Sequence, residues 1–286
     1  MSRLLPLLRL LRVGTLFSPA ADVVASSAIA GLPWSWSVAA AVCASTSLYA
    51  AGMVWNDVAD RKSDALLRPE RPLPRGDVSL PLTVALGTAL IGLGLWLSPC
   101  RGYHGLIAAL VLAYDFLGKR VAWLGVLGMG TLRALNLATA LAFGGEQTAS
   151  GSATSLLVAA VCYGFYIVAV TILGIFEDLP QVRARAVAAV QTAPPLCAFC
   201  GLCVVQGHVW PAPAIAAVPI VWFLRRIART MNWDQAAIRR SMTFLLLGTM
   251  LYTALLALAA GRPIEAIAIG SAILPARWIA RRIALT

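Results

Sequence analysis

The stretch WNDVADRKSDALLRPERPLPRGDVS, residues 55–79, decides how the rest of the sequence is interpreted. It places three aspartates, Asp57, Asp60 and Asp64, directly after an apolar run and follows them with arginines. If the apolar helix continues into this stretch at 3.6 residues per turn, Asn56 and the three aspartates fall within about 100° of one another around its axis. The sequence therefore predicts one helix face that carries an amide and three carboxylates.

The composition around this stretch is that of an integral membrane protein. Of 286 residues, 60% are hydrophobic and 12% are charged, and the mean hydropathy is +0.81. A soluble domain of this length cannot bury so much apolar surface. We expect a single domain over residues 1–286, all-α, with nine or ten transmembrane helices. The apolar runs, most of them near the ~20 residues that a spanning helix needs, are 14–32, 36–55, 79–98, 104–118, 122–144, 154–176, 187–206, 211–228, 242–260 and 263–280.

The basic residues indicate how these runs are oriented, because cytoplasmic loops retain Lys and Arg. With ten spans, all but three of the 23 basic residues fall on one side: Arg101 and Arg262 lie opposite, and Arg133 lies inside the fifth run. Nine spans remain open if the last run is interfacial. We expect a multi-pass protein of a bacterial inner membrane with both termini cytoplasmic. The net charge of +11 then reflects topology and attraction to anionic lipid headgroups, and nucleic acid is not expected as a partner.

The aspartates at this membrane interface require a cation. Carboxylates crowded on one face repel one another and raise each other's pKa unless a cation lies among them. Mg²⁺ takes oxygen ligands and commonly bridges one or two carboxylates to substrate phosphates, and the arginines that follow are suited to the remaining phosphate charge. A solvated acidic patch is the alternative, but it does not explain why the polar side chains share one face. We therefore predict a magnesium–diphosphate site with the metal ligands Asp57, Asp60 and Asp64.

The same residues carry a family resemblance. NDVADRKSD at Asn56–Asp64, with RPERPLPRGDVS at Arg68–Ser79, resembles the first aspartate-rich motif of the UbiA superfamily of intramembrane prenyltransferases, including its Arg-Pro-Leu-Pro-x-Gly tail. Weaker similarity covers most of the chain, including YDFLGK at Tyr114–Lys119 and MGTLRALN at Met129–Asn136. That pair of motifs is similar to the EboC-like branch of the superfamily.

The resemblance implies a helical bundle around an apolar cavity open to lipid, in which Mg²⁺ and two aspartate-rich loops clamp an isoprenyl diphosphate. The implied reaction transfers the isoprenyl group to a lipophilic acceptor through an allylic carbocation, with the metal and basic residues stabilising the departing diphosphate. By position, the metal would be carried by Asn56, Asp57, Asp60 and Asp64, and the phosphates would contact Arg71, Arg75 and Lys119. The sequence names neither the acceptor nor the prenyl length.

The sixth apolar run departs from the family pattern, which usually ends this helix with a second pair of aspartates about one turn apart. In TILGIFEDLPQVRAR, residues 171–185, Glu177 and Asp178 are adjacent and project about 100° apart, while Gly174 occupies the preceding turn. We assign both as catalytic candidates, with Asp178 as a metal ligand. Three alternatives stay open: one carboxylate suffices, the branch binds diphosphate without ionising it, or the acidic pair beside Pro180 simply ends a helix.

Polar side chains inside the membrane form a second group of candidates. Ionisable groups at this depth cost roughly 2.5–3.5 kcal/mol, so they normally face the bundle interior and are paired. Arg133 and Asn136 are three residues apart and share a face, and we expect them to bind substrate in the cavity together with Tyr114. A structural ion pair between Arg133 and either Asp22 or Asp115 is the alternative.

Two other classes of protein are alternatives to this interpretation. The CDP-alcohol phosphotransferases have a motif that resembles Asp-Gly-x-x-Ala-Arg, whereas Asp57 is followed by Val58. A non-catalytic isoprenoid- or lipid-binding protein, or an export accessory protein, on the same scaffold is the alternative function. CAFCGLC, residues 197–203, turns successive thiols around a helix and has no His or acidic residue nearby, so we expect packing residues there and no metal.

Overall fold

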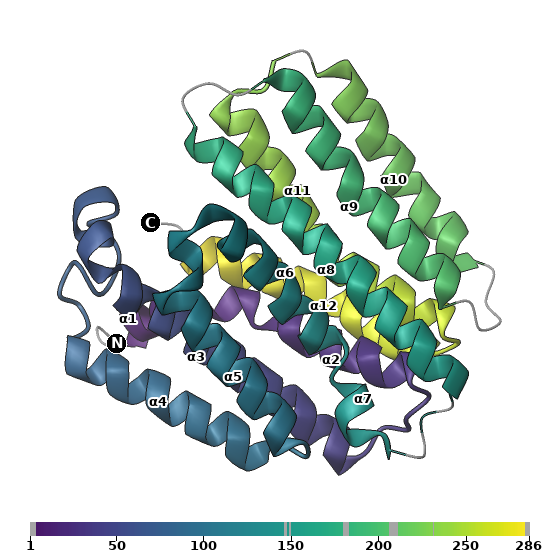
Figure 1. The fold of residues 1–286 in the computed structure, drawn as a ribbon, viewed down its shortest axis with the longest axis horizontal. Helices are drawn as coiled ribbons and strands as arrows, with labels where there is room; N and C mark the ends of the chain where they lie inside the picture. Colours follow the sequence, from purple (N-terminus) through teal and green to yellow (C-terminus); the bar gives the residue numbers. More distant parts are fainter. Residues whose placement is uncertain are drawn as a thin grey trace.

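The computed structural model describes residues 4–145, 148, 150–179, 183–205, 211–230 and 232–283. All regular secondary structure in these ranges is helical (Figure 1). The helices are α1 (Leu4–Leu10), the 3₁₀ turn η1 (Val13–Thr15), α2 (Phe17–Ile29), α3 (Trp36–Leu67), α4 (Leu80–Leu97), α5 (Arg101–Phe116), the 3₁₀ turn η2 (Gly118–Arg120), α6 (Ala122–Leu137), α7 (Ala140–Phe143), α8 (Ser150–Asp178), α9 (Ala184–Val204), α10 (Pro211–Arg229), α11 (Gln235–Ala259) and α12 (Pro263–Ile283).

The expected multi-pass, all-helical membrane fold is confirmed. Seven of the described helices are long and apolar enough to cross a membrane, and α1 with η1–α2, bent by 43°, makes an eighth if the pair is one span. Helices α5 and α6 have 16 residues each, fewer than the ~20 that a straight span needs. Every apolar run of the sequence overlaps at least one helix, but the count of nine or ten spans stays a prediction.

The run expected at 122–144 forms two helices, because the chain breaks between α6 and α7. The Thr139 hydroxyl donates back to the Asn136 carbonyl (2.8 Å), which competes with helix propagation. The Ala140 amide donates to Ser26 Oγ of α2 (2.9 Å). A side chain of a neighbouring helix therefore replaces a carbonyl of the same helix at this point.

Helix α3 positions the aspartates. It begins at Trp36, where the Ser35 hydroxyl accepts from the Val38 amide (3.4 Å), and it ends at Leu67. No Gly or Pro interrupts residues 53–68, and Pro69 disfavours helical backbone at the residue before it. The prediction that this helix continues past Trp55 is confirmed, and it does so for 12 residues, about 18 Å.

Close approach of α6 and α8 forms one wall of the bundle. A Cβ atom on Gly130 would lie 2.8 Å from the Gly164 carbonyl oxygen, so the two backbones come this near only because both residues lack side chains. Small residues at such crossings are the usual means of packing helices in lipid, where the hydrophobic effect does not drive association. The crossing brings Arg133 of α6 against Tyr163 of α8.

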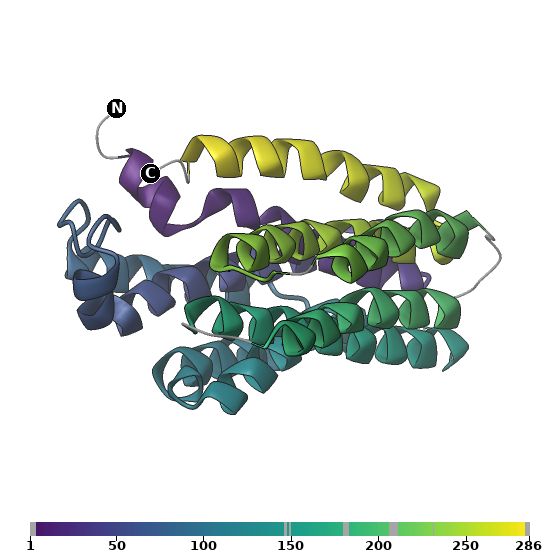
Figure 2. The same cartoon turned by 90° about the horizontal axis from the view of Figure 1, so that it is seen from above.

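The two ends of the described chain meet near the aspartates. Arg9 Nε of α1 donates to the Ile283 carbonyl at the end of α12 (3.2 Å). In Figure 1 both helix ends lie on the same side of the molecule as the connection between α3 and α4. Seen from above, α12 runs along one edge of the bundle, and α5 and α6 lie on the opposite edge (Figure 2).

Candidate active site

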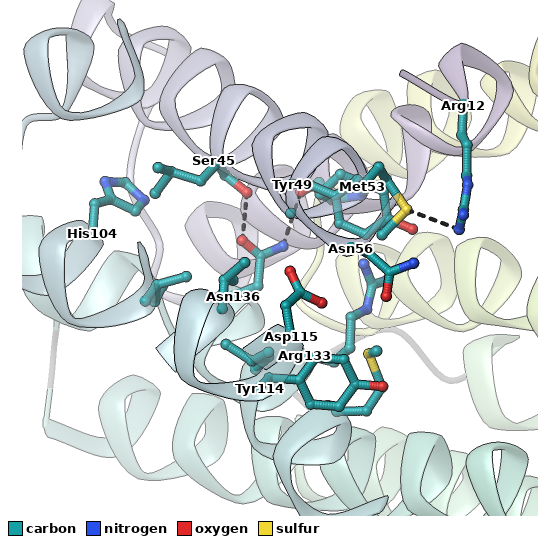
Figure 3. A pocket seen from close by; sticks show the side chains of 17 residues that line it. Arg12, Ser45, Tyr49, Met53, Asn56, His104, Tyr114, Asp115, Arg133 and Asn136 are labelled. Carbon is teal, nitrogen blue, oxygen red and sulfur yellow. Dashed lines mark hydrogen bonds between the residues drawn. The ribbon is translucent and has the colours of Figure 1, made fainter. Parts of the chain in front are cut away.

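A cavity of about 260 Å³ lies among α2, α3, α5 and α6, and Figure 3 shows the side chains that line it. Most of its wall is apolar. Polar groups enter at separate points along its length, which suits a site that binds an apolar ligand and orients it through a few contacts. The lining residues are Arg12, Pro19, Ser45, Leu48, Tyr49, Gly52, Met53, Asn56, His104, Ile107, Val111, Tyr114, Asp115, Met129, Leu132, Arg133 and Asn136.

One end of the cavity opens beside the aspartate face of α3, where Lys119 meets two side chains of that face. Its Nζ atom lies 2.6 Å from Asp60 Oδ1 and donates to Asn56 Oδ1 (3.0 Å). Lys119 comes from η2, directly after α5, so the turn that ends α5 delivers the ammonium group. Lys119, which the family resemblance implies as a phosphate contact, thus lies beside the aspartate stretch.

Two arginines hold the other carboxylates of this face. Arg71 Nη1 lies 2.6 Å from Asp64 Oδ2 and 3.6 Å from Asp57 Oδ1. Arg12 Nη2 lies 2.9 Å from the same Asp57 oxygen, while Arg12 Nη1 donates to Met53 Sδ (3.4 Å). Asp57 and Asp64 are buried, so each of these ions is paired where an unpaired charge would be costly.

Three cations therefore balance the three carboxylates of α3. Within the ranges that the structure describes, no three His, Cys, Asp or Glu side chains lie close enough together to hold one metal ion. The donor chemistry nevertheless suits Mg²⁺, because carboxylate and amide oxygens on one face are the ligands it prefers. In this structure the charge of the carboxylates is balanced by the guanidinium groups of Arg12 and Arg71 and the ammonium group of Lys119.

Arg75, the third residue predicted to bind phosphate, lies apart from the cavity. Arg75 is more than half exposed, and its Nε atom pairs with Asp77 Oδ2 (3.2 Å) in the connection between α3 and α4. Tyr114 lines the cavity as expected, close to the Lys119 end of α5. The structure thus brings Asn56, Tyr114 and Lys119 together and leaves Arg75 outside.

Arg133 lies in the cavity wall and is paired with Asp22. Its Nη2 atom is 3.1 Å from Asp22 Oδ2 and donates to Ser18 Oγ (2.6 Å) and to the Tyr163 hydroxyl. The ion pair with Asp22, one of the two partners expected on structural grounds, is formed, and none of the hydrogen bonds of Arg133 goes to Asp115. The contacts join α2, α6 and α8 within the membrane.

Asn136 continues this buried network, and Figure 3 shows its amide between α3 and α2. Its Nδ2 donates to Asp22 Oδ2 (2.8 Å) and to the Pro19 carbonyl (3.2 Å). Its Oδ1 accepts from the Ser45 hydroxyl. Both hydrogen atoms of the amide are used within the protein, so the amide is held in one orientation.

The second acidic motif has different surroundings. Glu177 Oε1 lies 2.7 Å from Arg239 Nε of α11. Asp178, the last residue of α8, is exposed and makes no hydrogen bond or ion pair with the described residues. Neither residue lines the cavity.

Four residues of the site were not identified as site residues from the sequence. Arg12 was counted only for topology, and Asp115 was considered only as a structural partner of Arg133. Asp115 is 3% exposed, and its Oδ2 has no hydrogen-bond partner among the described residues. Ser45 and His104 also line the cavity. Asp115 could have been identified from the sequence, because it lies within the motif YDFLGK. No local sequence pattern distinguishes Arg12, Ser45 or His104.

Comparison with known sequences agrees with the motif. A profile described as the UbiA prenyltransferase family matches residues 16–248, more than half of the chain. Similar curated proteins include digeranylgeranylglyceryl phosphate synthases from Metallosphaera sedula (36% identical over 93 residues) and Saccharolobus solfataricus (34% identical over 93 residues). Each alignment covers 31% of this chain and 33% of the relative, so the chain matches about a third of the length of these proteins.

Two solved structures share the fold. One is described as "Structural and mechanistic insights into the biosynthesis of Digeranylgeranylglyceryl phosphate synthase in membranes"; it has a TM-score of 0.64 at 18% identity and covers 93% of this chain and 99% of its own. The other is described as the apo structure of a UbiA homolog from Aeropyrum pernix K1; it has a TM-score of 0.61 at 19% identity and covers 91% of this chain and 96% of its own. At such identities the likeness concerns the fold alone.

Proposed function

The chain belongs to the UbiA prenyltransferase family, and from this premise we propose that it transfers an isoprenyl group from an isoprenyl diphosphate to a lipophilic acceptor with the help of Mg²⁺. The observation that carries the proposal is the junction of two environments. A carboxylate face balanced by Arg12, Arg71 and Lys119 borders an apolar cavity. A molecule with a charged head and a hydrocarbon tail fits such a junction.

The basic side chains at this junction would bind the diphosphate when it is present. Mg²⁺ would be held on the face formed by Asn56, Asp57, Asp60 and Asp64, through one or two carboxylates for each ion, and it would supply charge neutralisation at the leaving diphosphate. Lys119 and Arg71, now paired with carboxylates, would then turn towards phosphate oxygens, which they bind through charge-assisted hydrogen bonds. The exchange leaves each of these cations beside an anionic partner before and after binding.

The chain's own residues would promote the transfer by holding charge where it develops. The bond between C1 of the isoprenyl group and the diphosphate oxygen breaks, and its electron pair leaves with the diphosphate. Lys119, Arg71 and Arg12 stabilise that charge more strongly as it grows, and only this difference lowers the barrier. A nucleophile of the acceptor then forms the new bond to C1 and loses its proton.

The cavity wall suits the intermediate of this reaction. Tyr49 and Tyr114 place aromatic rings in a largely apolar chamber, and the face of such a ring attracts a cation. The apolar lining also keeps water from capturing an allylic carbocation. The acceptor's identity is not carried over from the relatives, because the alignments with them cover only about a third of their length.

A non-catalytic isoprenoid- or lipid-binding or accessory role is the second candidate, and one observation favours it. Glu177 pairs with Arg239 and Asp178 lies exposed at the end of α8, so neither carboxylate of the second motif lines the cavity. Binding needs only the first acidic face, whereas ionisation also needs stabilisation of the departing charge.

The orientation in the membrane is part of the proposal. We place the aspartate face, the start of α1 and the end of α12 on the cytoplasmic side of a bacterial inner membrane. The concentration of basic residues on that side supports this orientation. A cysteine introduced at Ser79 of a cysteine-free variant should resist labelling from outside, and labelling there would reverse the topology.

Pyrophosphate release distinguishes the two candidate functions. Purified protein is incubated with Mg²⁺, isoprenyl diphosphates of several lengths and a membrane extract that contains acceptors. An enzyme releases pyrophosphate, chelation of Mg²⁺ abolishes the release, and the substitution Asp60→Ala lowers it by about 10²–10³. No release at any prenyl length, from protein shown to bind the diphosphate, would establish the non-catalytic role.

A further inference from the structure

His104 lies at one end of the cavity, and Asn56 and Arg12 lie towards the other end, as Figure 3 shows. It is separated from Asp115 by eleven residues of the same helix, about 16 Å along the axis. On α3, Ser45 and Asn56 line the cavity with the same separation. A ligand group at His104 is therefore too far from the carboxylates of α3 to be the diphosphate.

The imidazole of His104 is buried and lacks one hydrogen-bond partner. Its side chain is 0% exposed and lines the cavity. Nδ1 lies 2.6 Å from Ser98 Oγ, in the connection that precedes α5, whereas Nε2 has no partner among the described residues. Nδ1 is thus held by Ser98, and Nε2 is available to a ligand in the cavity.

The neighbours of Ser98 indicate which nitrogen carries the proton. Ser98 Oγ already accepts from the Cys100 amide (3.0 Å), which leaves its own proton free to donate to Nδ1 of His104. In the opposite arrangement the one acceptor for the serine proton among the described residues would be Cys100 Sγ at 3.9 Å, a weak acceptor. Nδ1 therefore accepts, and Nε2 carries the ring proton.

A buried N–H donor selects what binds beside it. A hydrocarbon tail that filled this end would leave the donor unpaired, which is costly, whereas an oxygen atom would pair with it. We propose that the Nε2–H of His104 binds a neutral oxygen of the acceptor, a carbonyl, ether or hydroxyl group. Ser98 acts as a positioning residue that fixes the tautomer. Naming the ligand as the acceptor rests on the proposed prenyl transfer; the oxygen-binding site itself does not.

The site also divides the cavity between the two substrates. The acceptor lies along α5 with its oxygen at His104 and its reacting group towards the aspartate end. The isoprenyl tail then leaves the neighbourhood of the carboxylates without reaching His104. His104 is in this way a specificity-determining residue that distinguishes oxygenated lipids from plain hydrocarbons.

Two probes with one carbon skeleton test the site in the full-length protein in lipid nanodiscs. They are 2-methyl-1,4-naphthoquinone, which has carbonyl oxygens, and 2-methylnaphthalene, which has none. The wild-type protein should bind the quinone more tightly by about tenfold, the value of one buried hydrogen bond. His104→Leu should lose this preference, and His104→Gln, whose amide also donates, should keep it. Equal affinity of the wild-type protein for both probes, or an unchanged preference in His104→Leu, would overturn the proposal.

Nitrogen NMR supplies a measurement that does not depend on substituting His104. The sequence contains one other histidine, His208, so His208→Gln protein labelled with ¹⁵N-histidine reports on His104 alone. The spectrum should show the proton on Nε2, and the quinone but not the hydrocarbon should shift that signal. A proton on Nδ1, or the same response to both probes, would contradict the assignment.

Binding of isoprenyl diphosphate separates this inference from the proposed function. His104→Leu should bind a labelled isoprenyl diphosphate as the wild-type protein does, with the same dependence on Mg²⁺. If neither the wild-type protein nor His104→Leu binds the diphosphate, the proposed function fails. The preference for the quinone over the hydrocarbon then still tests the His104 site independently. If both bind it and the probe preference is absent, only the His104 site is refuted.

Discussion

The carboxylates at the end of α3 and those at the end of α8 are alike in chemistry and differ in their neighbours. Asp57, Asp60 and Asp64 meet cations that arrive from three other parts of the chain, and they border an apolar cavity. Glu177 meets an exposed arginine of α11, and Asp178 meets no described partner. The comparison shows that cations and an apolar chamber converge on the carboxylates of α3, whereas those of α8 lie away from the chamber.

The largest effect is expected from Asp60→Ala on the α3 side of the comparison. The change removes a proposed metal ligand and leaves the Lys119 ammonium without its carboxylate. Turnover should fall by about 10²–10³, the usual cost of losing a group that stabilises developing charge. Equilibrium binding of a labelled isoprenyl diphosphate should lose its dependence on Mg²⁺.

Asp77→Ala is the matched control, because Asp77 is a partly exposed acid whose one ion pair among the described residues is with Arg75. Such a pair contributes about 0–1 kcal/mol, so turnover should stay within roughly twofold. If Asp60→Ala kept the wild-type dependence on Mg²⁺, the carboxylate face would not be the metal site.

A smaller effect is expected from Lys119→Met, which tests whether the cations of the α3 face exchange partners. Loss of one charge-assisted contact to phosphate should weaken diphosphate binding by about 10–100-fold. Without diphosphate, the same change should strengthen the binding of Mn²⁺, measured by electron paramagnetic resonance, because Asp60 and Asn56 no longer hold an ammonium group. Weaker binding of the metal alone would contradict the exchange.

Asp178→Asn tests the α8 side, with Glu177→Gln as its matched partner. Asp178 has no partner among the described residues. If it contacts the diphosphate, its loss should lower turnover by about tenfold, as the loss of one interaction with a charged group does. Glu177 is already paired with Arg239, and its loss should cost less than about twofold. If both Asp178→Asn and Glu177→Gln left turnover unchanged, the second acidic motif would have no part in the mechanism.

The smallest effect is expected from Gly174→Asp, which places a carboxylate one turn before Asp178. A Cβ atom at Gly174 would meet only Met242 Cε, at 3.3 Å, and this flexible side-chain end can move aside. The variant should fold, and turnover should rise by about two- to threefold if a paired carboxylate improves charge stabilisation. Gly174→Ala controls for the added volume. A loss of turnover in Gly174→Asp alone would show that the α8 end repels the substrate.

The helices were predictable because lipid imposes a simple rule on the sequence. Each apolar run had to become a helix, since backbone groups find no other partners in a bilayer. The extension of α3 to Leu67 followed from the absence of Gly and Pro before Pro69. The break after α6 was not predictable, because its cause, the Ser26 hydroxyl, lies 114 residues away.

The same limit applied to the candidate site. The spacing of Asn56, Asp57, Asp60 and Asp64 was local and could be recognised. The partnership of Arg12 with Asp57 spans 45 residues and depends on how α1 packs against α3. His104 has no local pattern, because its importance arises from a nitrogen left unpaired by the packing of α5.

The contact between α1 and α12 has a consequence for biogenesis. Arg9 bonds to Ile283, and Gly14 packs so closely on Ala280 that a Cβ atom would lie 2.7 Å from the Ala280 nitrogen. The partners of the hydrogen bond are 274 residues apart, which a ribosome translating about 5–20 residues per second covers in roughly 14–55 seconds. The support that α12 gives to the segment around Arg12 is therefore absent until α12 has been inserted, so a chain whose synthesis stops before α12 lacks that support.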